Sequence, residues 1–172
     1  MIHPRYHLTS LMLTWEQLCE DKRFQDLPFK IETNARGQIL MSPTSMYHGS
    51  NANRIARLLE NLMGDGEVIV ECAVETADGV KEADAAWVSE ELWEKVQDMH
   101  ASSPSPEICV EVVSKSNSME ELMIKRQLFI SAGAREYWLC DKQGNMRFFD
   151  GVKELDQSVM CPGFPKLLPS RR

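Results

Sequence analysis

The segment from residue 107 to residue 125 constrains the fold of this chain more than any other. It begins with the letters EICVEVV, whose β-branched residues predict a strand inside a sheet. Side chains alternate along a strand, so one face carries Ile108, Val110 and Val112, and the other carries Glu107, Cys109, Glu111 and Val113. Glu111 therefore faces the interior, where an ionised carboxylate costs several kcal/mol unless a cation or hydrogen-bond donors meet it.

A lysine in the next predicted helix is placed to meet this acid. At about 100° per residue, Lys125 falls among Leu128, Phe129 and Ala132, inside the apolar arc of the helix. Two interpretations of the pair remain open from these residues alone: a functional site, or a buried structural ion pair. Lys125 could also pair with Glu121 on an exposed face, which is worth only a few tenths of a kcal/mol.

Hydrophobic periodicity and turn residues predict the other elements. The capping-box letters TWEQ begin a helix at Thr14 that ends before Pro28. The remaining helices are predicted over about 46–63, 89–99 and 119–132. Strands are predicted over 29–32, 37–41, 67–75, 82–88, 107–113, 135–140 and 146–149, with 42–45 as a loop. On the strand over 67–75, Val68, Val70, Cys72 and Val74 are expected to share one face. On the next strand, Glu82, Asp84, Ala86 and Val88 are expected to do so. This order predicts an α/β fold with a mixed sheet, in which the strands at 107 and 135 are parallel.

Length and composition bound the class of protein. The 172 residues, 43% hydrophobic and 26% charged, predict one soluble domain over 1–172, with a core of about 14–149 and an irregular tail over 150–172. No apolar run is long enough to span a membrane. The five cysteines are widely spaced and odd in number, which indicates the reducing cytoplasm. The sequence has no Cys-x-x-Cys pair and no histidine cluster, which argues against a structural zinc site. A net charge of −7 argues against a broad basic surface for nucleic acid, but not against a local one.

Several short motifs occur in a characteristic order. They are Glu32 five residues before Gly37, the letters MSP at 41–43, His48 near the start of a helix, Asp84, the letters EVVS at 111–114, Lys125, and the letters GAREYW at 133–138. This arrangement resembles the PD-(D/E)XK nuclease superfamily and, within it, the Uma family of restriction-endonuclease-like proteins, over about residues 14–149. In that family the lysine of the superfamily motif has moved to the following helix. Val113 stands at its usual place and Lys125 would replace it.

The resemblance implies a restriction-endonuclease-like fold, with a mixed central sheet flanked by helices and an extra N-terminal helix and hairpin. It implies a Mg²⁺-dependent endonuclease that hydrolyses DNA, with Mn²⁺ as a substitute. Asp84, Glu111 and the backbone carbonyl of Val112 would hold the metal, and Lys125 would position or help to deprotonate the attacking water. Ala83, Lys115 and Phe129 depart from the prolines and the tyrosine common in the family, but none of these changes removes a ligand.

Four further residues are candidates to support the ligands or to contact the substrate: Glu32, His48, Glu107 and Glu121. A homodimer is compatible with the resemblance, because cutting both strands of a duplex needs two sites. Two other functions stay open: an inactive nucleic-acid or protein interaction domain of the same fold, and a structural oligomer whose acids and lysine only neutralise each other.

Overall fold

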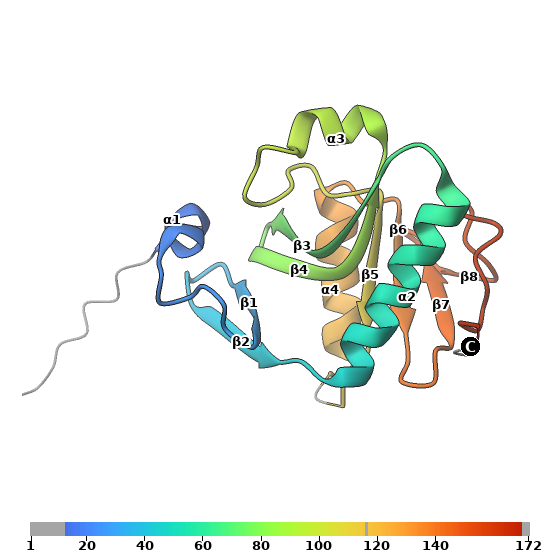
Figure 1. Ribbon diagram of the computed structural model, residues 1–172, viewed down its shortest axis with the longest axis horizontal. Coiled ribbons are helices and arrows are strands. Elements are labelled where there is room, and N and C mark those ends of the chain that lie inside the picture. Colours follow the sequence, from blue (N-terminus) through green and yellow to red (C-terminus); the bar gives the residue numbers. More distant parts are fainter. Residues whose placement is uncertain (1–12, 116, 170–172) are drawn as a thin grey trace, which may run out of the picture.

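The computed structural model describes residues 13–115 and 117–169 and is built around a six-stranded sheet (Figure 1). The strand order is β3 (Glu67–Thr76), β4 (Gly79–Val88), β5 (Ile108–Val112), β6 (Glu136–Cys140), β7 (Met146–Phe149) and β8 (Glu154–Leu155). Strands β5 and β6 are parallel, and the other neighbouring strands are antiparallel. The mixed sheet predicted from the sequence is confirmed.

Two long helices cover opposite faces of this sheet (Figure 1). Helix α2 (Met46–Met63) packs Ile55 and Leu59 onto the face that carries Val110. Helix α4 (Met119–Ala132) packs Leu122 and Phe129 onto the face that carries Cys109. The predicted assignment of β5 side chains to the two faces of the sheet is therefore confirmed, and Glu111 points to the side of α4. Helix α3 (Glu90–Val96) precedes β5 and is shorter than predicted.

The N-terminal segment adds a small second sheet. Helix α1 (Trp15–Glu20) has the predicted capping box at Thr14 but ends well before Pro28, because Asp21 adopts an extended backbone and binds Arg23. Strands β1 (Phe29–Thr33) and β2 (Ile39–Pro43) pair antiparallel, so residues 42 and 43 belong to a strand and not to the predicted loop.

Close contacts dock this hairpin on β4. Thr33 Oγ1 accepts a hydrogen bond from Val80 N at 2.9 Å, and Thr33 O accepts one from Lys81 Nζ at 2.7 Å. Gly79 allows the approach, since a Cβ there would lie 2.8 Å from Thr33 O. The hairpin is thus held against the central sheet by the first residues of β4.

The alternation of side chains is interrupted in the middle of β3 and β4. Glu71 has a φ of 52°, and the ladder skips the pair formed by Glu71 and Asp84. Ala83 and Ala86 consequently both pack on the side of α4, although strict alternation would place them on opposite faces. Likewise Val68 packs on the side of α2, whereas Cys72 and Val74 pack on the side of α4. The prediction that alternate residues share one face along the whole of β3, and likewise along the whole of β4, is therefore wrong.

The segment after β7 contributes to the core, although much of it is irregular as predicted. The short strand β8 extends the sheet beyond the predicted elements. Cys161, Phe164 and Leu168 are buried on the side of α2, where the Phe164 ring lies 4.6 Å from that of Trp138, centre to centre. Among the described residues, no helix has the length and apolar character needed to span a bilayer.

Candidate active site

Asp84 is positioned by the divergence of β4 and β5. These strands pair only from Ala85 to Trp87, so the backbone of β5 beyond Val110 has no ladder partner on β4. The Asp84 carboxylate fills this gap, and its Oδ2 accepts a hydrogen bond from Val112 N at 2.6 Å. The side chain is 3% exposed and lies beside Glu111 at the point where the two strands separate.

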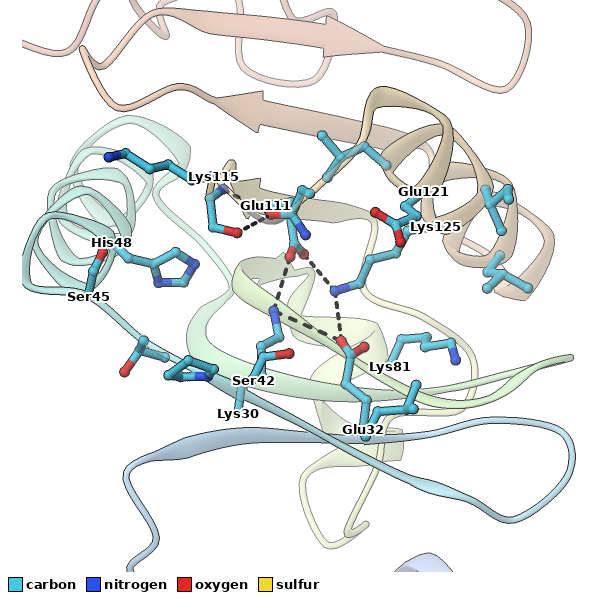
Figure 2. Close-up of a pocket in the computed structure, with 18 of the residues that line it drawn as sticks. Lys30, Glu32, Ser42, Ser45, His48, Lys81, Glu111, Lys115, Glu121 and Lys125 are labelled. Carbon is cyan, nitrogen blue, oxygen red and sulfur yellow. Dashed lines mark hydrogen bonds and ion pairs between the residues drawn. The ribbon is translucent and has the colours of Figure 1, made fainter.

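The carboxylates of Asp84 and Glu111 share one cation. Lys30 Nζ lies 2.7 Å from Asp84 Oδ1 and 3.2 Å from Glu111 Oε1. Lys30 comes from β1 in the N-terminal hairpin, so a residue far upstream in the sequence completes the centre of the site (Figure 2).

Lys125 binds the second oxygen of Glu111. Its Nζ lies 2.8 Å from Glu111 Oε2 and 2.7 Å from Glu32 Oε1 (Figure 2). It also lies 2.8 Å from the backbone carbonyl oxygen of Glu82. Glu32 Oε1 also accepts a hydrogen bond from Glu82 N at 2.9 Å. The predicted contact between Glu111 and Lys125 is present, and the alternative pair of Lys125 with Glu121 is not formed.

His48 completes the contacts of Asp84. It lies in the first turn of α2, and its Nε2 is 3.0 Å from Asp84 Oδ2. The hydrogen bond with Asp84 raises the pKa of His48, and the charge of Asp84 acts in the same direction against burial. Asp84 Oδ2 is thus held by His48 and Val112 N, while Oδ1 faces the shared cation.

The buried acids of the site have different proton affinities. Burial favours the neutral form of Asp84, but the His48 hydrogen bond and the charge of Lys30 prevail and hold its pKa below the usual range. Burial and the neighbouring Asp84 charge raise the pKa of Glu111, against the effect of the two lysines. Burial also raises the pKa of Glu82 to about 7. For Glu32, burial is outweighed by Lys125 and Lys30, so its pKa is lowered.

One side of a pocket of about 750 Å³, between the hairpin, the start of α2 and α4, is lined by Lys30, Glu32, His48, Glu111 and Lys125 (Figure 2). Asp84 and Glu82 line a second, smaller pocket, which also includes His48. Five lysines contribute to the walls of the larger pocket: Lys30, Lys81, Lys115, Lys125 and Lys142. Four acids do so as well: Glu32, Asp78, Glu111 and Glu121. The lysines of the pocket outnumber its acids by one, a local balance that the net charge of −7 does not reveal.

The structure brings together six of the predicted site residues: Glu32, His48, Asp84, Glu111, Val112 and Lys125. The contact of Val112 is the hydrogen bond from its backbone N–H to Asp84. Glu107 lies at the other end of β5 and accepts hydrogen bonds from Ser89 N and Ser89 Oγ at 3.1 and 2.5 Å. Glu121 lines the pocket, but its carboxylate is engaged in the capping box with Ser118. Neither of these two acids contacts Asp84, Glu111 or Lys125 within the part of the chain that the structure describes.

The sequence interpretation did not include Lys30. A signal for it existed, because Lys30 lies two residues before Glu32 and side chains two apart share a face of a strand. The pattern could place Lys30 beside Glu32 but could not show that the hairpin brings it to Asp84 and Glu111, which are 54 and 81 residues away in sequence.

The donor set suits a hard divalent cation with few protein ligands. Over residues 13–115 and 117–169, no group of three or more His, Cys, Asp or Glu side chains is placed to hold a metal ion. Mg²⁺ is commonly bound by one or two carboxylates and keeps several waters. Asp84 Oδ1 and Glu111 Oε1 converge on one cation, the ammonium of Lys30, so these two carboxylates are the donors that would hold such an ion in its place.

Fold and site together define a restriction-endonuclease-like α/β protein. The family model described as "Uma2: Putative restriction endonuclease" matches residues 16–154, and the chain belongs to this family. The membership confirms the predicted family and suggests a nuclease of the restriction-endonuclease type.

Comparison with solved structures supports the fold. Five chains match, among them the crystal structure of "a putative nuclease belonging to DUF820 from Anabaena variabilis ATCC 29413". Its TM-score is 0.69, with 91% of this chain and 95% of that chain covered. The sequence identity is 10%, so this likeness shows the fold alone. A comparison with curated proteins found no match.

Proposed function

We propose that this protein is a Mg²⁺-dependent endonuclease that hydrolyses phosphodiester bonds of DNA in the pocket described above. One observation carries the proposal: each acid has one oxygen held by the protein and one that faces a shared cation. For Asp84 these are Oδ2 and Oδ1, and for Glu111 they are Oε2 and Oε1. Two carboxylates arranged in this way, next to a lysine, form the core of a cation-dependent phosphoryl-transfer site.

When bound, Mg²⁺ or Mn²⁺ supplies a Lewis acid that polarises a phosphoryl oxygen and lowers the pKa of a bound water. Asp84 and Glu111 would hold the ion with the backbone carbonyl of Val112. His48 and Val112 N fix the orientation of Asp84, since both contact Oδ2. Each of these residues comes from a rigid helix or strand, which limits how far the two acids can move apart.

Lys125 would act on the substrate from the opposite side of Glu111. Its ammonium would stabilise the negative charge that develops on the phosphoryl group, or position the attacking water. Glu32 and the carbonyl oxygen of Glu82 hold this ammonium in place at 2.7 and 2.8 Å. Glu32 therefore serves to orient Lys125, not to bind the ion.

The walls of the pocket favour an anionic polymer. The five lysines named above surround the acids, and some apolar surface lies nearby, including Leu40 and Ile124, which are 43% and 51% exposed. Phosphate groups supply most of the affinity in protein–nucleic acid complexes, and exposed apolar side chains can contact sugars and bases. A homodimer would present two such sites to the two strands of a duplex. A cytoplasmic location is in keeping with the five free cysteines.

A second function, that of a non-catalytic interaction domain, is favoured by one specific observation. Lys30 and Lys125 already form ion pairs with Asp84, Glu111 and Glu32, so much of the negative charge of the site is compensated without a metal ion. A buried ion pair of this kind is a sufficient structural reason for the acids to be present.

Cleavage of supercoiled plasmid DNA distinguishes the two functions. Wild-type protein with Mn²⁺ or Mg²⁺ should nick or linearise the plasmid, and EDTA should abolish this. Asp84→Asn and Glu111→Gln should each lower the rate by roughly 100-fold or more, as expected for loss of electrostatic catalysis. Glu91→Gln, an acid whose side chain is 83% exposed in a surface ion pair, should leave the rate unchanged. Absence of cleavage together with absence of Mn²⁺ binding in calorimetry would reject the nuclease.

A further inference from the structure

Within the described part of the chain, Lys30 is the one basic side chain that contacts both Asp84 and Glu111. Its Nζ contacts Asp84 Oδ1 and Glu111 Oε1, the two oxygens that face away from His48 and Lys125. The same nitrogen is 4.0 Å from Glu32 Oε1, and its contacts with Glu111 and Glu32 can be followed in Figure 2. Its side chain is only 9% exposed. It therefore forms ion pairs with both acids, at 2.7 Å from Asp84 and 3.2 Å from Glu111, in a place that is largely closed to solvent.

A divalent ion held by these same oxygens would need the space that the ammonium occupies. Mg²⁺ lies at about 2.0–2.1 Å from its oxygen ligands and tolerates little distortion. Two cations between one pair of carboxylates would also repel each other strongly at low dielectric. The ion and the ammonium of Lys30 are therefore mutually exclusive at this position.

Lys30 is better able to leave than Lys125. All the contacts found for Lys30 Nζ in the described residues are to the three carboxylates, so it has no backbone partner that would hold it once the acids bind an ion. Lys125, by contrast, also donates to the carbonyl oxygen of Glu82. Lys30 lines the pocket of about 750 Å³, and its long flexible side chain has room to swing into that space.

We propose that Lys30 is an internal counterion that holds Asp84 and Glu111 together in the metal-free protein and is exchanged for the divalent ion when the ion binds. This inference rests on the proposed function, since it takes the two acids to be the ion's ligands. It has two consequences. The site stays assembled without metal, and the affinity for the ion is lowered by the competing ammonium.

Titration calorimetry with Mn²⁺ tests the competition. Lys30→Met removes the charge and keeps an unbranched side chain, so its dissociation constant for Mn²⁺ should be lower than that of the wild type by about five-fold or more. Lys95→Met is the matched control, because Lys95 also pairs with an acid but is 61% exposed on the surface, and its Mn²⁺ affinity should equal that of the wild type. A folded Lys30→Met protein that binds Mn²⁺ no more tightly than the wild type would overturn the inference.

A second measurement uses the wild-type protein and so does not depend on the folding of the variant. An amine-reactive acylating reagent should modify Lys30 several-fold faster with saturating Mn²⁺ than with EDTA, as read by peptide mass spectrometry. The exposed Lys95 serves as the internal reference and should react equally in both conditions. Equal modification of Lys30 with and without the ion would show that the amine does not leave.

The outcomes separate the inference from the proposed function. If wild type and Lys95→Met bind Mn²⁺ and Lys30→Met binds it no better, the exchange is rejected while the nuclease stands. If only Lys30→Met binds Mn²⁺, competition by Lys30 is supported and the wild-type protein is not a metal-dependent nuclease. If none of the three proteins binds the ion, both proposals fail, and Lys30 is a permanent structural partner of the acids.

Discussion

The ammonium of Lys125 on α4 lies 2.7 Å from Glu32 Oε1 on β1, across a sequence separation of 93 residues. The same nitrogen contacts the Glu82 carbonyl on β4 and Glu111 on β5. A helix, the hairpin and two strands of the central sheet therefore meet at one charged atom. The three oxygen contacts fix the position of the amine, although the lysine side chain itself is long and flexible.

Substitution of Lys125 tests its role in the reaction. Lys125→Met should lower the rate of plasmid cleavage by roughly 100-fold or more, because a positive charge near the reacting phosphoryl group is lost. Lys125→Arg should restore little of this rate, since a planar guanidinium cannot reproduce the contacts of an ammonium to three converging oxygens. Cleavage rates and circular dichroism spectra of the three proteins provide the measurement. A rate for Lys125→Met close to that of the wild type would contradict the assigned role.

Stability should depend on pH through Glu32. Its pKa is lowered by Lys125 and Lys30 in spite of burial, so its ionised form stabilises the folded state. That contribution is fully present above the unfolded pKa of about 4.3 and is lost as the pH falls through the lower folded value. Glu32→Gln should reduce the free energy of unfolding by roughly 1–3 kcal/mol near neutral pH. The difference from the wild type should shrink below about pH 4, as urea denaturation in EDTA can show. A difference that grows on acidification would refute this account.

The unusual backbone of Glu71 predicts a stabilising substitution. A φ of 52° in a non-glycine residue costs about 1–2 kcal/mol, and glycine adopts this conformation freely. Glu71→Gly should therefore leave the free energy of unfolding unchanged or raise it by up to about 1 kcal/mol. Glu75→Gly, at an exposed and regularly paired position of the same strand, should lower it by roughly 0.5–1 kcal/mol. Chemical denaturation of both variants provides the comparison, and equal losses would contradict the prediction.

A buried acid outside the site should matter only for folding. Glu136 is 2% exposed and accepts hydrogen bonds from Trp138 Nε1 and Ser158 Oγ, and from the backbone N–H groups of Val159 and Met160. Glu136→Gln would replace one acceptor oxygen by a donor and should cost about 1–3 kcal/mol in thermal or chemical unfolding. Glu154→Gln, in a surface pair with Arg147, should cost less than about 1 kcal/mol. If both variants lose the same stability, the four hydrogen bonds of Glu136 are not important for folding.

The sequence predicted those parts of the fold and site where local periodicity carries the information. The two faces of β5 follow from alternation, and the inward direction of Lys125 follows from helical geometry. The position of Asp84 beside Glu111 came from the motif order of the family and not from physical reasoning, since nothing local shows that β4 and β5 are neighbours. Metal binding by Asp84 and Glu111 and the catalytic role of Lys125 stay predictions.

Other features depend on tertiary contacts that periodicity does not encode. The unpaired position at Glu71 and Asp84 has no marker such as a glycine, so unbroken alternation was predicted for both strands. The docking of the hairpin partly buries Glu82, and this burial raises its pKa to about 7, which the alternation of side chains could not show. Lys30 was missed for the same reason, because its partners come from distant strands.

The burial of Phe164 and Leu168 sets a limit on how far the chain can be shortened. The family match ends at residue 154, and a fragment trimmed to that boundary would appear complete by alignment. It would nevertheless leave the rings of Trp138 and Phe148 without the aromatic neighbour that covers them. Such a fragment would expose a hydrophobic patch to solvent and should aggregate into inclusion bodies when expressed, even with the acids and lysines of the site unchanged.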